Sequence, residues 1–130
     1  MPLVHIHVIE NKRTPEQLRR LADVVQDVML EHFAAPDRDR YQLITEHKPG
    51  QIIAEDTGLG FERTDDIVVV QIAQQGRSVD QKTAMNRALA DQLHTETGMA
   101  PTDVIVSVVE NTRDDWSFGN GIAQFVEGHL

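Results

Sequence analysis

The chain has 130 residues and a mass of 14.6 kDa, which suits one domain with a single core and is too short for two. Its net charge of −9 argues against nucleic-acid and membrane partners, because no basic surface is available to neutralise phosphates. The absence of cysteine excludes disulfides and thiol chemistry, and there is neither a signal peptide nor an apolar run of about 20 residues. These features predict a cytoplasmic globular protein.

An internal repeat organises the chain. When the sequence is shifted by 64 positions, the segment 3–27 falls on 67–91, so that Arg13 matches Arg77. Each half begins with an apolar strand rich in β-branched residues, continues into a helix and ends in a second strand. The four strands are predicted at Leu3 to Ile9, Tyr41 to Glu46, Ile67 to Ala73 and Val104 to Val109. The single domain, residues 1–130, therefore consists of two strand-helix-strand units at about 2–47 and 66–110.

The two predicted helices begin with the same chemistry. Thr14 and Ser78 each stand three residues before a Gln, which is the spacing of a capping box. Pro15 fits the first helical position of the first helix, and Gly98 is placed to end the second. Apolar residues recur at helical spacing, at Leu18, Leu21, Val25, Val28 or Met29, and Phe33 in the first helix and at Met85, Leu89 and Leu93 in the second. We expect these stripes to face the core.

The repeat predicts an α+β fold. The two strands of each unit lie parallel through a right-handed crossover. A pseudo-two-fold axis perpendicular to the sheet would place the two first strands antiparallel within a four-stranded mixed sheet, with both helices on one face. Between the units, residues 51–63 are predicted to form a hairpin around Thr57-Gly58-Leu59-Gly60, and residues 112–130 to form an ordered aromatic and glycine-rich segment.

The most reactive group that the sequence suggests is the nitrogen of Pro2. Removal of Met1 would leave a secondary amine fixed at the start of a core strand. An α-amino group ordinarily titrates at about 8, so this amine can be a base, a hydrogen-bonding cation or a nucleophile that forms an iminium with a carbonyl. Pro2 is therefore the first candidate catalytic residue.

The predicted topology brings other polar groups to the same end of the sheet. The start of the first strand lies beside the end of the third, where Gln74, Gln75 and Arg77 follow. The second strand is parallel to the first, so its start, with Asp39 and Tyr41, also lies at that end. The groups gathered there are Pro2, Asp39, Tyr41, Gln74, Gln75 and Arg77.

The chemistry of this cluster follows from its charges. Arg77 can hold a carboxylate through two parallel hydrogen bonds, and Asp39 can orient an ammonium group or a water molecule. These groups predict a small carboxylated carbonyl substrate. At the repeat-related end, Asp66, Asp103 and Arg13 occupy the equivalent places, but Asp66 is inside the chain and its nitrogen is only an amide.

Several segments along the whole chain carry a resemblance to a known family. They are Asp39-Arg40-Tyr41-Gln42, Pro49-Gly50, Glu55 to Gly60, Arg77-Ser78 with Gln81-Lys82, Asp103 to Val106, and Asp115 to Gly119 with Gly121. Together with Pro2, these segments resemble the tautomerase superfamily, and within it the malonate semialdehyde decarboxylases. The resemblance implies a homotrimer of tandem β-α-β units, without metal or organic cofactor.

The resemblance also implies roles for particular residues. It implies catalysis by the Pro2 amine, an aspartate that falls on Asp39, and an arginine pair at the end of the third main strand. Arg77 matches the second arginine, whereas the first place is held by Gln75, or by Gln74 if Gly76 is an insertion. Because Gln brings no charge, this departure counts against hydration or dehalogenation of unsaturated acids more than against decarboxylation.

Three functional hypotheses stay open at this point. The first is a decarboxylase of malonate semialdehyde or a close 3-oxo acid, in which Trp116 and Phe118 wall the site, or else pack in the core or at a subunit interface. The second uses the same amine as an acid or base for tautomerisation, hydration or dehalogenation. The third is a non-catalytic trimer that binds small molecules or proteins. His5 and His7 have a spacing that zinc sites sometimes use, but no third ligand is evident, so no metal site is predicted.

Overall fold

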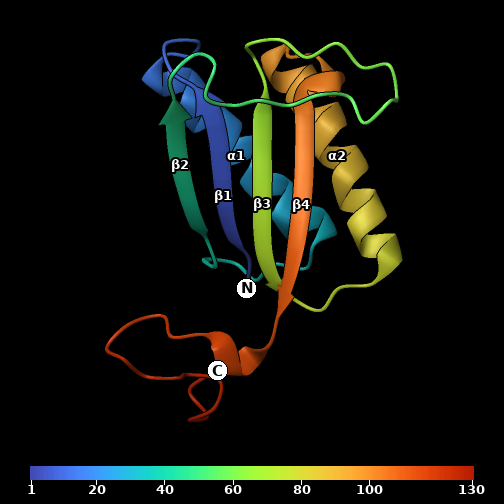
Figure 1. The fold of residues 1–130 in the computed structure, drawn as a ribbon. Coiled ribbons are helices and arrows are strands. Elements are labelled where there is room, and N and C mark those ends of the chain that lie inside the picture. The colour runs from blue at the N-terminus through green and yellow to red at the C-terminus, as the bar shows by residue number, and fades with distance from the viewer.

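Four strands form one mixed sheet, and both helices cover one of its faces (Figure 1). The structure, a computed structural model, describes residues 1–130. Its main elements are β1 (Leu3–Ile9), α1 (Pro15–His32), β2 (Tyr41–His47), β3 (Val68–Gln75), α2 (Val79–Thr97) and β4 (Val104–Asn111), with short 3-10 helices at Pro101–Asp103 and Arg113–Asp115. The predicted α+β architecture is confirmed.

The strand order β2-β1-β3-β4 obeys the symmetry that the repeat predicts. β1 pairs with β2 in parallel, β3 pairs with β4 in parallel, and β1 and β3 are antiparallel neighbours at the centre. Leu3 lies opposite Ala73, so the start of β1 meets the end of β3. The N-terminus and the Gln75–Arg77 segment therefore reach the same edge of the sheet.

The helix boundaries follow from local capping. The Thr14 and Ser78 side chains each accept from the backbone N–H of the residue three positions on, and the Gln at that position accepts from the cap's own N–H. α2 ends at Gly98, whose φ of 76° lies in the left-handed region that glycine adopts without strain. The predicted capping boxes and the predicted stop are all present.

The two faces of the sheet differ in their surroundings. The core lies on the helix-facing side, where Ile6, Val70 and Ile72 pack against α1 and α2. The outer face carries intermediate and exposed side chains, including His5, His7 and Gln71. Core residues supplied by the two helices include Leu21, Val25, Val28, Met29, Phe33, Met85, Leu89 and Leu93, as the periodicity predicts.

The predicted hairpin at residues 51–63 is wrong, because no strand forms between β2 and β3. The Asp56 carboxylate accepts hydrogen bonds from the backbone N–H groups of Gly58 and Gly60, at 3.0 and 2.9 Å. The Arg63 side chain donates to the backbone carbonyl of Glu55. Local side-chain bonds and turns thus satisfy backbone groups that a hairpin would pair across strands.

The segment after β4 is ordered by aromatic contacts. It extends beyond the sheet on the side of the N-terminus (Figure 1). The Trp116 and Phe118 rings stack at 5.2 Å, and Phe125 meets Phe118 edge-on at 5.8 Å. Phe118 also lies 5.4 Å from the ring of Tyr41, which fixes the segment to the start of β2.

No helix of the protein is long and apolar enough to cross a membrane.

Candidate active site

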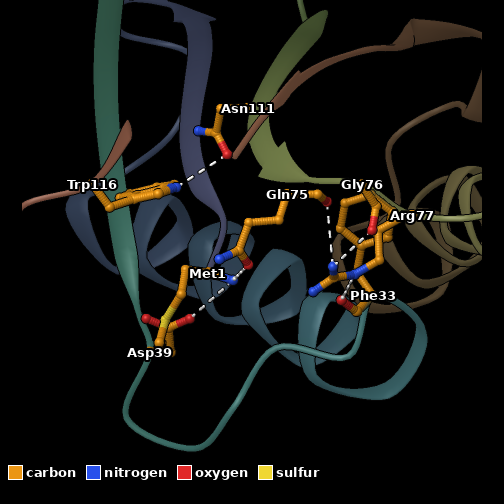
Figure 2. Close-up of polar contacts among 8 residues, drawn as sticks. All are labelled: Met1, Phe33, Asp39, Gln75, Gly76, Arg77, Asn111 and Trp116. Carbon is orange, nitrogen blue, oxygen red and sulfur yellow. Dashed lines mark hydrogen bonds and ion pairs between the residues drawn. The ribbon is translucent and has the colours of Figure 1, made fainter. Parts of the chain in front are cut away.

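The amine at the start of the chain contacts polar groups from two segments that are far apart in the sequence. The Met1 ammonium forms an ion pair with Asp39 Oδ2 at 3.5 Å and donates to Gln75 Oε1 at 3.2 Å (Figure 2). Pro2 follows as a buried residue. The Met1 nitrogen therefore lies one residue before the nitrogen that would become the terminal amine after removal of Met1.

Asp39 is a buried carboxylate, with 6% of its surface exposed. It precedes β2 in a tight turn, where its N–H donates to the Pro36 carbonyl at 3.2 Å and Arg38 has a φ of 65°. Burial raises the pKa of Asp39, and the neighbouring amine acts in the opposite direction. Burial lowers the pKa of the Met1 amine from its ordinary 8.0; the charge of Asp39 opposes this shift and that of Arg77 adds to it.

Arg77 is a cation without a carboxylate partner. Its Nε donates to the Phe33 carbonyl at 2.9 Å, and its Nη1 donates to the carbonyls of Gln75 and Gly76 at 3.3 and 3.1 Å (Figure 2). The guanidinium also lies over the Phe33 ring, 5.6 Å from its centroid. Burial lowers the pKa of Arg77, although a guanidinium stays charged at neutral pH. Three backbone carbonyls hold the group while Nη2 forms no hydrogen bond within the chain.

The structure separates the two glutamines that sequence reasoning left as alternatives. Gln75 lies on the outer face of β3, and its amide oxygen contacts the terminal amine. Gln74 points the other way, toward the helices, with 1% of its surface exposed and no hydrogen bond to its amide. Because side chains alternate along a strand, only one of two successive residues can face this site.

Aromatic residues line two cavities beside the amine. One, of about 340 Å³, lies between Met1, Asp39, Tyr41 and Phe118. The other, of about 350 Å³, is lined by Leu3, Tyr41, Trp116 and Phe118 among others. Tyr41, Trp116 and Phe118 are thus brought together at the end of the sheet that holds Asp39.

The comparisons with known proteins identify the family to which the chain belongs. A family model described as tautomerase enzyme matches residues 39–119, and a second of the same description matches residues 2–62. The chain belongs to the tautomerase superfamily. Probable tautomerase YrdN of Bacillus subtilis (strain 168) is 46% identical over 130 residues, 100% of both chains. Probable tautomerase YusQ of the same organism is 33% identical over 128 residues, 98% of this chain and 100% of the relative.

Two solved structures of malonate semialdehyde decarboxylases superpose closely on this tautomerase-superfamily protein. The first has a TM-score of 0.94 and 38% identity, and the comparison covers 98% of each chain. The second, which is inhibited by 3-bromopropiolate, has a TM-score of 0.93 and 42% identity over 98% of this chain and 97% of that one. The chain is therefore an enzyme of this superfamily that is structurally similar to malonate semialdehyde decarboxylases.

Sequence reasoning missed two parts of this tautomerase-like site. Asn111, at the end of β4, accepts a hydrogen bond from Trp116 Nε1 at 3.0 Å (Figure 2). The pairing of Gln75 with Asn111 in the parallel β3–β4 register would have indicated it. His129 and Leu130 line the cavity beside Met1, and no local sequence signal places them there.

The two histidines of β1 belong to a separate cluster on the outer face. His5 Nε2 lies 2.6 Å from Thr45 Oγ1, and His7 lies 2.8 Å from His47 and 2.7 Å from Gln71 Oε1. The structure contains no group of three or more His, Asp or Glu residues arranged to hold a metal ion. The imidazoles are therefore hydrogen-bonded to neighbouring strands and not to the terminal amine.

Proposed function

We propose that this protein is a cofactor-free decarboxylase of malonate semialdehyde or a close 3-oxo acid, and that the catalytic group is the Pro2 amine released by removal of Met1. The observation that carries this proposal is the environment of the chain's terminal amine. The buried carboxylate of Asp39 lies 3.5 Å from it and the amide oxygen of Gln75 lies 3.2 Å from it. Arg77 follows Gln75 by two residues and has no carboxylate partner. The superposition on two malonate semialdehyde decarboxylases supports the choice of substrate.

The proposed reaction needs one anchored carboxylate and one electron sink. Arg77 would hold the substrate carboxylate so that the breaking carbon–carbon bond stands perpendicular to the carbonyl plane. As CO2 leaves, the bonding electrons flow toward the carbonyl, and protonation of the carbon gives acetaldehyde from malonate semialdehyde. Pro2 would act in one of two ways: as an ammonium that stabilises the developing enolate, or as an amine that forms an iminium with the carbonyl.

The environment of the amine suits either route. Burial lowers the pKa of the terminal amine, which favours the neutral nucleophile, whereas Asp39 favours the ammonium. The aromatic side chains of Trp116 and Phe118 would exclude water from the cavity that they line and so strengthen polar interactions of a substrate bound there. Gln75 supplies a hydrogen bond but no second cation, which is less suited to adding water to an unsaturated acid.

A tautomerase activity is the second candidate. The two Bacillus subtilis relatives are named probable tautomerases, and a terminal amine with a lowered pKa can serve as a general base near neutrality. In this alternative the Pro2 amine would move a proton between carbon and oxygen of a small unsaturated acid. No carbon–carbon bond would break.

We also propose that the protein acts as a homotrimer. Apolar side chains are exposed on the outer face of the sheet, with Leu43 53% and Val109 64% exposed. The helices leave this face uncovered, and exposed apolar surface of this kind is typical of subunit contacts. Sedimentation analysis would measure the assembly.

The decisive experiment compares two forms of the N-terminus. In the first, intact mass shows that the chain starts at Pro2; in the second, one glycine precedes Met1 and prevents its removal. We expect the processed form to convert malonate semialdehyde to acetaldehyde, followed by NMR, at about 100 to 10,000 times the rate of the extended form. Equal turnover by the two forms would remove the amine from the mechanism.

A panel of small oxo and unsaturated acids then separates the two candidate activities. Release of CO2 from a 3-oxo acid supports decarboxylation, whereas exchange of a substrate proton without loss of carbon supports tautomerisation. Borohydride trapping of a covalent adduct with Pro2 would identify the iminium route, and turnover without an adduct would favour the hydrogen-bonding route.

A further inference from the structure

A further cavity lies at the end of the sheet opposite to the terminal amine. It has a volume of about 300 Å³ and lies between the start of α1 and the end of α2. We call it the mirror pocket, and its walls include Lys12, Arg13, Gln17, Arg20, Asp66 and Thr97. Met99 is the one apolar side chain among the residues that line it. Such walls suit a small polar ligand and not an apolar one.

The mirror pocket is related by the internal repeat to the site around Met1. Arg13 and Arg77 each precede the hydroxyl residue that caps a helix, and Asp103 and Asp39 each precede the second strand of a unit. The equivalent of Pro2 is Asp66, which is inside the chain. This end therefore repeats the arginine and the aspartate but has no free backbone amine.

Arg13 has hydrogen-bonding capacity that the chain does not use. Its Nη2 donates to the Asp66 carbonyl at 2.6 Å, while its Nη1 is buried and has no partner. Burial lowers the pKa of Arg13, opposed by the charges of Asp66 and Asp103, yet the guanidinium stays charged at neutral pH. A buried donor without an acceptor is uncommon in folded proteins.

Of the two carboxylates whose charges act on Arg13, Asp66 lines the pocket and Asp103 is already engaged by hydrogen bonds. Asp103 Oδ1 accepts from the Thr64 N–H at 2.7 Å, and Asp103 Oδ2 accepts from the Thr64 hydroxyl at 2.5 Å. Lys12 pairs with Asp65 at 3.4 Å.

The remaining cation on the walls of the mirror pocket is also neutralised. Arg20 forms an ion pair with Glu96. Arg13 is therefore the cation of the mirror pocket that has no ion pair, and an incoming anion would not have to displace a carboxylate from it.

We propose that the mirror pocket is a second, non-catalytic binding site for small aliphatic carboxylates, with Arg13 as the group that recognises the carboxylate. The planar guanidinium offers paired donors that match the two oxygens of a carboxylate. The polar side chains of Gln17 and Thr97 can complete the hydrogen bonding of an acid of a few carbon atoms. Because the pocket has no chain-terminal amine and the Lys12 ammonium is paired with Asp65, the pocket would hold such an acid and leave it unchanged. This proposal does not depend on the decarboxylase assignment.

The test uses malonate, which is stable in solution and carries no carbonyl for an amine to attack. Titration of the full-length protein, followed by backbone amide NMR, should shift two separate groups of signals: one around Met1 and Asp39, and one around Lys12, Thr97 and Gly98. Arg13→Gln should weaken binding at the second group by at least about 10-fold and leave the first group unchanged. Arg77→Gln should do the reverse, and Arg87→Gln on the exposed face of α2 should change neither.

A second variant guards against loss of folding. Arg13→Lys keeps the charge but loses the paired donors, so it should weaken malonate binding at the mirror pocket while preserving the folded spectrum. The proposal is overturned if malonate shifts no signal near Thr97 and Gly98 in the unmodified protein. It is equally overturned if the folded Arg13→Gln and Arg13→Lys variants both retain full binding there.

Discussion

The two ends of the β1–β3 strand pair carry equivalent residues of the repeat, but only one end has the terminal amine of the chain. At one end, Asp39 faces the amine at the start of the chain. At the other end, Asp103 faces the backbone N–H and hydroxyl of Thr64, and no free amine is near. One unit begins the chain, and only that unit can offer a titratable backbone nitrogen, which is the group that we propose to be reactive.

The two aspartates show the physical consequence of this difference. Asp103 is fully buried, and both of its oxygens accept hydrogen bonds from Thr64. Asp39 is also buried, but its Oδ2 has no hydrogen bond and only an ion pair with the terminal amine. A buried carboxylate with unused bonding capacity is costly for the fold and available for chemistry. The fold therefore uses both oxygens of Asp103 for hydrogen bonds, whereas Asp39 keeps bonding capacity that the fold does not use.

The largest effect is expected from changing the amine itself. In processed protein, Pro2→Ala should lower decarboxylation by about 100-fold or more, because the secondary amine that forms an iminium or donates to the carbonyl is lost. The rate is measured by NMR with malonate semialdehyde, and sedimentation checks the assembly. Pro15→Ala, at the first position of α1, is the matched control and should keep full turnover. Unchanged turnover by the Pro2 variant would remove the central assignment.

The next effect concerns the arginine that distinguishes carboxylated substrates. Arg77→Gln should lower kcat/KM for malonate semialdehyde by about 10- to 100-fold, because a charged hydrogen bond to the substrate carboxylate is lost. Reaction with an uncharged aldehyde, followed by borohydride trapping, should change little. The exposed Arg87→Gln is the matched control. An equal loss with both substrates would contradict the anchoring role.

The smallest effect is expected on the free energy of unfolding when either of the two aspartates is replaced. Asp103→Ala should lower the free energy of unfolding by about 2 to 4 kcal/mol, because the N–H and hydroxyl of Thr64 lose their acceptors. Asp39→Ala should change it by less than about 1 kcal/mol, because no hydrogen bond is lost and a buried charge is removed. Urea unfolding at fixed protein concentration measures both. A larger cost for the Asp39 variant would reverse the assignment of the two roles.

The pH dependence of stability sharpens the same comparison. The pKa of Asp39 is raised in the folded state above its ordinary 3.8, so the unfolded chain loses this proton first as the pH rises. Ionisation of Asp39 should therefore reduce stability as the pH increases from 3.8 through the raised folded value, with no further change above it. Urea unfolding across this window should show that decline in the native sequence and not in Asp39→Ala. A native sequence that instead gains stability relative to the variant would contradict the raised pKa.

Much of the fold could be predicted because its signals are local. The capping boxes at Thr14 and Ser78 and the glycine stop at Gly98 need only a few neighbouring residues, and all three are present. The prediction of a hairpin at 51–63 was wrong because a different local structure forms there. Asp56 binds the backbone of Gly58 and Gly60, and this competing local structure is not visible in the strand-like pattern of the segment.

The sequence by itself determined the strands and the helix ends, because these follow from short-range patterns. The symmetry of the repeat then predicted the sheet order, which places Pro2, Asp39 and Arg77 at one end. Only the tertiary structure decided which of Gln74 and Gln75 faces the amine, since a one-residue shift along a strand reverses the face. It also decided which side chains close the site. The C-terminal aromatic residues reach it through contacts between segments far apart in the chain, and such contacts depend on packing that no local pattern encodes.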